Sequence, residues 1–214
     1  MAGIELIKRY FPELTPEQER QFSVMGELYP EWNEKINVIS RKDIDNLFEN
    51  HILHSLVIAK FLGTLKTGTT FMDLGTGGGF PGIPLAVMYP KCRFHLIDRV
   101  AKKLRVAEDI VKNAGIKNVS IQHGDSGECR ERFNYVVSRA VMPLNELVRI
   151  CVRNIAVKSP SENRYSNGII CLKGGDLEEE SKGIAYSVLE FPLNEIFSEA
   201  FYETKKLVYI PVKK

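Results

Sequence analysis

The most constraining feature of this 214-residue chain is a glycine-rich stretch between Phe71 and Gly82. It reads Phe-Met-Asp-Leu-Gly-Thr-Gly-Gly-Gly-Phe-Pro-Gly, which predicts the end of a buried strand, a tight turn and the start of a helix. Glycine has no Cβ, so the backbone can turn sharply at Gly75 and Gly77 and leave room for a ligand. Pro81 suits the first position of a helix, where its missing N–H costs nothing. In open α/β sheets, nucleotide-like ligands bind in this crevice.

Two kinds of ligand suit this turn. From Gly77 to Gly82 the sequence matches the dinucleotide fingerprint G-x-G-x-x-G, but the match begins after the apolar strand has ended at Leu74. Counted from Gly75, the pattern is acidic-x-Gly-x-Gly-x-Gly, with Asp73 just inside the strand. A carboxylate there repels a pyrophosphate and suits a cationic head, such as the amino group and sulfonium of S-adenosylmethionine. The stretch therefore favours a methyl donor.

From Thr69 onward, strand-like and helix-like runs alternate. We expect strands at residues 70–74, 92–97, 119–122, 135–138 and 169–172, helices at 81–88, 101–114 and 143–157, and two further strands at 187–191 and 206–211. Such alternation predicts an α/β fold, with a mostly parallel sheet, right-handed crossovers and helices on both faces. The polar segment 154–168, rich in Ser and Asn, is expected to be a loop.

The first 65 residues have the pattern of helices. One helix is expected to start at Thr15, with Pro at its first position and Gln three residues after the cap, and another to cover residues 40–63. The chain is therefore predicted to consist of a helical N-terminal extension, residues 1–65, and a Rossmann-like domain, residues 66–214.

Composition excludes several classes of protein. With 44% hydrophobic and 26% charged residues, the chain is typical of a globular protein. The net charge of +2 means that a nucleic-acid surface has to be a local basic patch. We see no run long enough to span a bilayer and no signal peptide, so no membrane association and a cytoplasmic location are expected.

Cysteines and histidines give no signal for a metal site. His51 and His54 lie one helical turn apart, but no third ligand of suitable spacing accompanies them, so packing or hydrogen bonding is favoured over metal binding. No C-x-x-C pair occurs, and buried free thiols in a reducing compartment are expected. The cysteines are Cys92, Cys129, Cys151 and Cys171.

Polar residues follow the predicted strands at the edge where a ligand would bind. Asp98 ends the second strand and can accept hydrogen bonds from both hydroxyls of an adenosine ribose. Gly124, Asp125 and Ser126 follow the third strand, where an acceptor suits the exocyclic amine of adenine. For Asp125 the alternative is a solvated turn.

Cations end the next two strands. Arg139 ends the fourth strand, and Lys173 with Gly174 ends the fifth. Two cations beside a methyl-donor pocket indicate an anionic acceptor such as a nucleic-acid backbone, so Arg139 and Lys173 are the candidate catalytic residues. The alternative for Arg139 is a structural partnership with Asp73 or Asp125.

Motifs that are absent narrow the chemistry. Amino-group methylation of adenine or cytosine typically uses an N/D/S-P-P-Y/F run at the fourth strand, but residues 138–143 read Ser-Arg-Ala-Val-Met-Pro. Cytosine C5 methylation needs a nucleophilic cysteine, commonly in a Pro-Cys pair, and none occurs. Guanine N7 needs neither device, because it has a free lone pair and no proton to remove, so alignment with the methyl group is the main requirement.

These residues together resemble a known family. The run Asp73-Leu-Gly-Thr-Gly-Gly-Gly-Phe-Pro-Gly-Ile-Pro-Leu-Ala, followed by Leu96-Ile-Asp, Ser138-Arg-Ala and Leu172-Lys-Gly, closely resembles the bacterial small-subunit rRNA guanine-N7 methyltransferases (RsmG or GidB). Upstream, Trp32-Asn-Glu-Lys-Ile-Asn and His51-Ile-Leu-His-Ser-Leu resemble the helical N-terminal part of that family. The resemblance extends from about residue 20 to about residue 180.

The resemblance implies a class I S-adenosylmethionine-dependent methyltransferase fold and N7 of one guanine in 16S rRNA as the acceptor. Matching positions place the cofactor against Gly75, Gly77, Phe80, Gly124, Asp125 and Arg139, with Asp73 and Asp98 supporting it. Two departures are that many members have Asp where this chain has His54, and that Gly124-Asp125 replaces a small or apolar residue followed by Glu. No metal is implied.

The implied partner is 16S rRNA, within the small ribosomal subunit or an assembly intermediate, bound by a monomer. The N-terminal extension and the basic residues Lys102, Lys103 and Arg105 are candidates for RNA contacts, the alternative being an ordinary solvated helix face. Two rival functions are a nicotinamide-dependent reductase, for which no tyrosine–lysine proton donor is evident, and a non-catalytic RNA-binding protein with the same fold.

Overall fold

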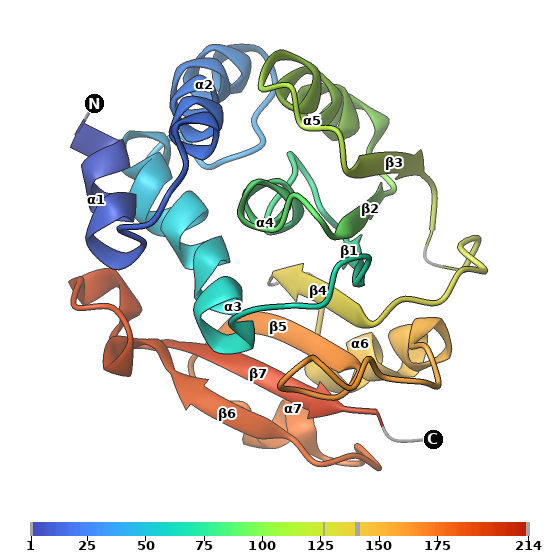
Figure 1. Ribbon diagram of the computed structural model, residues 1–214. Helices are drawn as coiled ribbons and strands as arrows, with labels where there is room; N and C mark the ends of the chain where they lie inside the picture. The colour runs from blue at the N-terminus through green and yellow to red at the C-terminus, as the bar shows by residue number, and fades with distance from the viewer. Residues whose placement is uncertain (1, 126, 140–141, 213–214) are drawn as a thin grey trace.

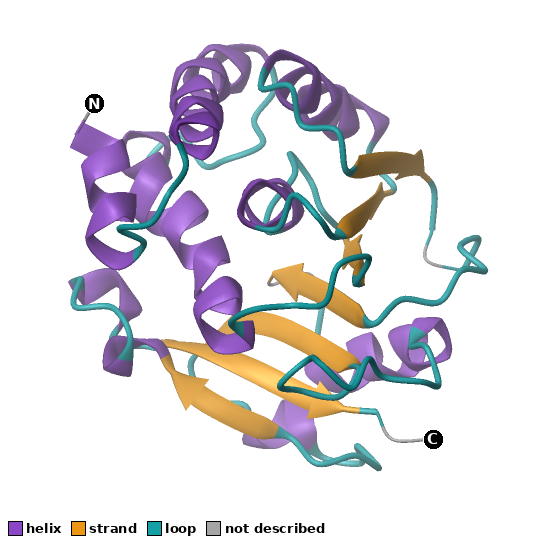
Figure 2. Ribbon diagram, viewed as in Figure 1, coloured by secondary structure: helices purple, strands orange, loops and turns teal. Residues whose placement is uncertain are grey.

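The fold is built around one twisted sheet. A computed structural model describes residues 2–125, 127–139 and 142–212. Over these residues the chain forms a seven-stranded sheet in the order β3-β2-β1-β4-β5-β7-β6 (Figures 1 and 2). The strands are β1 (Thr70–Leu74), β2 (Arg93–Asp98), β3 (Val119–His123), β4 (Tyr135–Arg139), β5 (Gly168–Gly174), β6 (Leu189–Pro192) and β7 (Lys205–Pro211).

The five strands β1–β5 are parallel, and β7 joins β5 in the antiparallel sense, with β6 antiparallel to β7 at the edge. The predicted α/β fold with a mostly parallel sheet is therefore confirmed. The register aligns Asp73 with Leu96 and Val137, so the carboxyl ends of neighbouring strands meet at one edge. This edge is where polar residues were expected to gather.

Helices cover both faces of the sheet (Figure 1). Successive residues of a strand point to opposite faces, so Phe71 and Val137 join one buried cluster whereas Met72 and Val136 join another. The first cluster includes residues of α2–α5 and the second includes residues of α6. The helices are α1 (Ala2–Tyr10), α2 (Pro16–Lys35), α3 (His54–Leu62), α4 (Gly82–Met88), α5 (Ala101–Asn113), α6 (Leu144–Cys151) and α7 (Glu178–Ser181).

The helix expected over residues 40–63 is wrong in its first half. A 3-10 turn, Ile44–Asn46, leads into a π-helix, Leu47–Leu53, and regular α-helix begins only with α3. The helix start at Thr15 is confirmed by a capping box, in which the Thr15 hydroxyl accepts from the Gln18 N–H and the Gln18 side chain accepts from the Thr15 N–H.

Two further helix predictions need correction. The helix expected from residue 143 ends at Cys151, and a 3-10 turn follows over Val152–Asn154. The helix ends there because the buried Asn154 side chain donates to the carbonyl oxygens of Cys129 and Glu131, which anchors this end of the chain beside the sheet. The four-residue helix α7 was not expected, since so short a segment has no periodic pattern.

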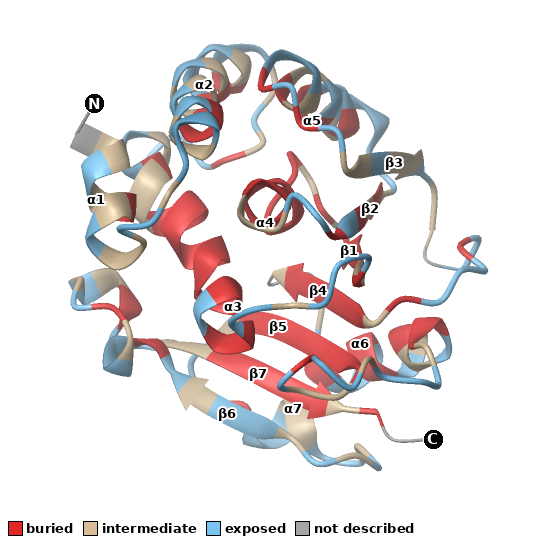
Figure 3. Cartoon of the chain, in the orientation of Figure 1, coloured by how far each residue is buried: buried red, intermediate tan, exposed pale blue. Residues whose placement is uncertain are grey.

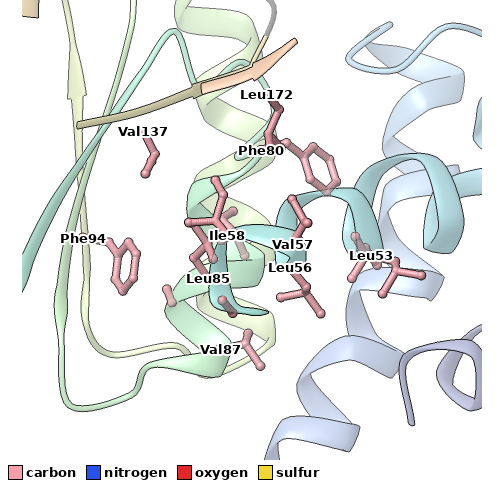
Figure 4. Packing of buried hydrophobic residues seen from close by; sticks show 14 of the residues in the cluster. Leu53, Leu56, Val57, Ile58, Phe80, Leu85, Val87, Phe94, Val137 and Leu172 are labelled. Carbon is pink, nitrogen blue, oxygen red and sulfur yellow. The ribbon is translucent and has the colours of Figure 1, made fainter. Parts of the chain in front are cut away.

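The N-terminal helices pack directly on the sheet domain. Leu56, Val57 and Ile58 of α3 lie beside Leu85 and Val87 of α4, in one buried cluster (Figure 4). Burial is continuous from α3 through α4 to the central strands (Figure 3). The division between residues 65 and 66 stays a prediction.

Hydrogen bonds add to this packing close to the glycine-rich loop. The buried Tyr29 hydroxyl of α2 donates to the carbonyl oxygen of Gly78 at 2.8 Å, and Trp32 Nε1 donates to Asp109 of α5 at 2.8 Å. The N-terminal segment therefore contacts the loop that was expected to bind a ligand.

No helix in the described residues is long and apolar enough to cross a membrane. The expectation of buried free thiols is confirmed at all four cysteines, and burial raises the pKa of Cys92 to about 11.

Truncating Met25 to Ala should lower the free energy of unfolding by about 2–4 kcal/mol, because this α2 side chain is fully buried and its loss leaves a cavity. Glu27→Ala, at an exposed position of the same helix, should change it by less than about 0.5 kcal/mol. Chemical denaturation followed by circular dichroism measures both. Equal effects of the two variants would contradict the packing of α2 on the sheet domain.

Candidate active site

The glycine-rich loop is built around a buried carboxylate. Asp73 is fully buried at the end of β1, and its Oδ2 accepts hydrogen bonds from the Thr76 hydroxyl at 2.6 Å and the Gly82 N–H at 2.7 Å. A Cβ at Gly82 would lie 2.7 Å from Asp73 Oδ2 and 2.9 Å from the Leu96 side chain. Only glycine fits there, so the loop and the start of α4 close around Asp73.

Asp98 holds the other side of the loop. Its Oδ2 accepts from the Gly77 N–H at 2.8 Å and its Oδ1 from the Val100 N–H at 2.8 Å. Gly77 has a φ of 56°, a left-handed conformation that side chains other than glycine rarely adopt. The carboxylate thus fixes the loop in addition to the ribose contact expected of it, and each of its oxygens retains a second lone pair.

A first cavity, of about 460 Å³, lies between this loop and the ends of β2, β3 and β4. It brings together six of the predicted site residues: Gly75, Gly77, Asp98, Gly124, Asp125 and Arg139. Apolar side chains of Ile97, Val100 and Ile150 line it too, and these were not expected because nothing separates them in the sequence from ordinary core residues.

Asp125 forms an ion pair with Arg99 beside this cavity. Lys103, expected to contact RNA, also lines this cavity, whereas Lys102 and Arg105 are exposed on α5. Ser126 and Ala140 lie outside the described residues.

The residues around the loop fit a cationic cofactor head. Asp73 Oδ1 is buried and has no hydrogen-bond partner among the described residues. Burial raises the pKa of Asp73 to about 7, although the hydrogen bonds from Thr76 and Gly82 and the charge of Arg139 oppose this shift. A buried acceptor without a partner is costly, and a nearby positive charge relieves that cost.

Phe80 lines neither the first cavity nor a second cavity that Arg139 also lines. Its ring is buried, 4.7 Å from the Tyr29 ring and 5.5 Å from the His51 ring. The Arg139 guanidinium lies over it, 5.0 Å from the ring centroid. Phe80 therefore packs against Arg139 and His51. The direct cofactor contact expected of Phe80 stays a prediction.

Arg139 lies where two cavities meet. It is half-buried at the end of β4 and lines both the first cavity and a second one of about 620 Å³. Burial lowers the pKa of Arg139 to about 10, while the charges of Asp73 and Asp43 hold it up. The side chain is therefore protonated at neutral pH. Its contact with Phe80 and its interaction with Asp73 fit a structural role, whereas its position in the lining of both cavities fits a functional one.

The second cavity combines the N-terminal segment with the ends of β4 and β5. Asp43, Asn50, His51 and His54 line one side, and Pro143, Leu172, Lys173, Glu180 and Phe201 are among the residues that line the other. Asp43 and Asn50 were not expected, because only the folded chain brings residues 43–54 over the sheet edge.

The positive charge of Lys173 is paired with a carboxylate in this cavity. Its Nζ donates to Glu180 Oε2 at 2.6 Å and to the Met142 carbonyl oxygen at 2.6 Å, and the same Glu180 oxygen accepts from the Leu144 N–H at 2.9 Å. Lys173 and Glu180 together therefore join β5, α6 and α7 by hydrogen bonds. Its predicted role towards an anionic acceptor stays a prediction.

The two histidines are neutral. Burial lowers the pKa of His51 to about 3 and that of His54 well below its usual range, and the Arg139 charge adds to both shifts. Both ring nitrogens of His51 and the Nε2 of His54 have no hydrogen-bond partner among the described residues. No group of three or more potential metal ligands occurs in the part of the chain that the structure describes.

The fold is that of the S-adenosylmethionine-dependent methyltransferases. A methyltransferase of this class from Aquifex aeolicus superimposes with a TM-score of 0.53 at 16% sequence identity, covering 77% of this chain and 92% of that one. At that identity the similarity establishes the fold alone. The two cavities beside the glycine-rich loop occupy the edge of the sheet where this fold binds its ligands.

The chain belongs to the GidB family, rRNA small subunit methyltransferase G, whose family model matches residues 18–185. The ribosomal RNA small subunit methyltransferase G of Bacteroides fragilis strain YCH46 is 50% identical over 210 residues, covering 98% of this chain and 92% of that protein. The protein of the same name from Bacteroides thetaiotaomicron is 52% identical over 206 residues, covering 96% and 98%. The family resemblance seen in the sequence is confirmed.

The free energy of unfolding of the cofactor-free protein should fall as the pH rises from about 4 to about 7. In this window the unfolded Asp73 carboxyl releases its proton whereas the folded one, with its pKa of about 7, retains it. The loss should be on the order of 2–4 kcal/mol and should be absent from Asp73→Asn, which keeps an acceptor for Thr76 and Gly82. Urea denaturation across pH 4–8 measures the difference, and parallel curves would contradict it.

Asp98→Ala should weaken S-adenosylmethionine binding by roughly 2–4 kcal/mol through the loss of charge-assisted hydrogen bonds. Calorimetry measures the affinity. Asp98→Asn is the matched variant, because it retains an oxygen for the Gly77 or Val100 N–H but loses the charge. An unchanged affinity in Asp98→Ala would remove this residue from the site.

Proposed function

We propose that this protein methylates N7 of a specific guanine in 16S rRNA with S-adenosylmethionine. The observation that carries the proposal is the pair of cavities that meet at Arg139 and Met142. The first, beside Asp73 and Asp98, suits the cofactor. The second is large enough for a purine and lies next to the first, so a base within it faces the cofactor across Arg139.

When bound, S-adenosylmethionine supplies a methyl group on a positively charged sulfur. Asp98, which lines the first cavity, would hold it through its remaining lone pairs, and Asp73, fully buried and outside the cavity lining, would act on it through its charge. Arg139, supported by Phe80, fixes the boundary between cofactor and base. The chain's contribution is alignment of the N7 lone pair with the methyl group and exclusion of water.

The electrostatics of the second cavity suit an acceptor that has no proton to lose. With a pKa of about 3, His51 is a poor general base at neutral pH. A neutral imidazole also avoids repulsion with the cationic 7-methylguanine that forms.

The substrate in this proposal is the small ribosomal subunit or an assembly intermediate, and the protein acts as a monomer in the cytoplasm. Exposed Lys102 and Arg105 on α5, near Lys103 at the first cavity, offer charges for the RNA backbone. Their contribution to binding should show as a dependence on salt concentration.

The direct test incubates small-subunit rRNA and particles from cells lacking this protein with radiolabelled S-adenosylmethionine. Digested nucleosides are then separated by chromatography. Label in 7-methylguanosine supports the proposal, and comparison of naked RNA with particles identifies the form that is used. Label in another nucleoside would overturn the N7 assignment. Cofactor binding without any transfer would favour a non-catalytic RNA-binding protein.

Arg139→Ala should abolish methyl transfer while leaving the fold intact, because the guanidinium lines both cavities and its contact with the Phe80 ring is one of several that hold that ring. The same radiolabel assay measures the rate, and thermal unfolding provides the control. Arg139→Lys, which keeps the charge but not the planar fork, should retain only part of the activity. Full activity of Arg139→Ala would exclude a catalytic role.

A further inference from the structure

Methylation at N7 does not by itself select guanine. Adenine carries an equivalent N7, and the two bases differ at position 6 and on the Watson–Crick edge. Guanine presents donors there, N1–H and the exocyclic amine, whereas adenine N1 is an acceptor. A site that methylates guanine alone therefore needs an acceptor directed at that edge.

Asp43 supplies such an acceptor in the second cavity. Its Oδ1 accepts a hydrogen bond from Asn50 Nδ2 at 2.8 Å, which orients the carboxylate. Its Oδ2 lies 3.9 Å from His51 Nε2, but His51 is neutral, and the positive charge that interacts with Asp43 is that of Arg139, which lines the same cavity. The Asp43 side chain remains 42% exposed, so the carboxylate is held in place and is accessible.

Glu180, the other carboxylate that lines this cavity, is in a different state. Lys173 neutralises its charge, and one of its oxygens already accepts from Lys173 and from the Leu144 N–H. Glu180 is therefore tied to α6 and β5. Asp43 is the carboxylate with capacity for a ligand.

The positive Arg139 and the negative Asp43 in this cavity favour one orientation of a bound guanine. Arg139 lines the cavity at its boundary with the first cavity, and Asp43 lies on the N-terminal segment. In guanine, O6 is an acceptor next to N7, and the N1–H and amine donors lie beyond it. With N7 towards the cofactor, O6 comes near the cation and the donors face away from it.

We propose that Asp43 is the residue that selects guanine, accepting hydrogen bonds from N1–H and the exocyclic amine of a base bound in the second cavity. Asn50 positions the carboxylate. Adenine is excluded because its N1 lone pair would face the carboxylate, and an unpaired buried acceptor discriminates strongly. The inference rests on the proposed function and assigns base selection to the N-terminal segment.

The test uses two RNA substrates for the full-length protein, one with guanosine and one with inosine at the methylated position. Inosine keeps N7, O6 and N1–H but lacks the exocyclic amine. Wild-type protein should lose about tenfold in kcat/KM on inosine RNA. Asp43→Asn should lose about ten- to a hundredfold on guanosine RNA and should no longer distinguish the two substrates.

Two controls separate base selection from a structural effect. Asp45→Asn makes the same change of charge at an exposed position two residues away and should behave like wild type. The affinity of Asp43→Asn for S-adenosylmethionine, measured by calorimetry, should be unchanged.

The possible failures are distinguishable. Wild-type protein that methylates both RNAs equally overturns the inference without any variant. An equal inosine penalty in wild type and Asp43→Asn overturns it as well. Wild-type protein that does not methylate guanosine RNA overturns the proposed function itself, and the inference with it.

Discussion

The architecture of this site depends on one buried carboxylate. Asp73 closes the glycine-rich loop by accepting from Thr76 and from the first N–H of α4, and its second oxygen has no partner among the described residues. Burying such a group is unfavourable without compensation, which explains its raised pKa. The arrangement is retained because β1 fixes the position of Asp73 and α4 fixes the Gly82 N–H from which Asp73 accepts. In the function that we propose, the positive charge of the bound cofactor would offset this cost.

The N-terminal helices form a wall of the site. Tyr29 bonds to the loop at Gly78, and Phe80 carries Arg139 on one side of its ring and packs against Tyr29 and His51. The first cavity is lined mainly by the sheet domain, whereas the second is lined in part by residues between Asp43 and His54. In the function that we propose, the cofactor and the acceptor base are therefore held by different parts of one packed unit.

The sequence predicted the parts of the site that depend on local pattern. Strand ends are recognisable from apolar runs, so the sequence alone assigns Asp73, Asp98 and Arg139 to one edge of the sheet. Asp43 and Asn50 could not, since their position depends on tertiary packing between separated segments. The ion pair between Lys173 and Glu180 could not be predicted from the sequence either, because the four-residue α7 that carries Glu180 shows no helical periodicity. The π-helix was missed because its residues have the apolar spacing of an ordinary helix.

That π-helix sets the direction in which the chain enters α3. Over Leu47–Leu53 each turn takes in more residues than an α-helix does, and the segment carries Asn50 and His51 to the cavity. A π-helix turns less per residue than an α-helix does, so closing the same segment as regular α-helix would add rotation along it. The chain before Leu47 would then rotate by roughly 100° relative to α3, carrying Asp43 away from the sheet edge. The wider turns of the π-helix therefore set the direction from which the residues before Leu47 approach the second cavity.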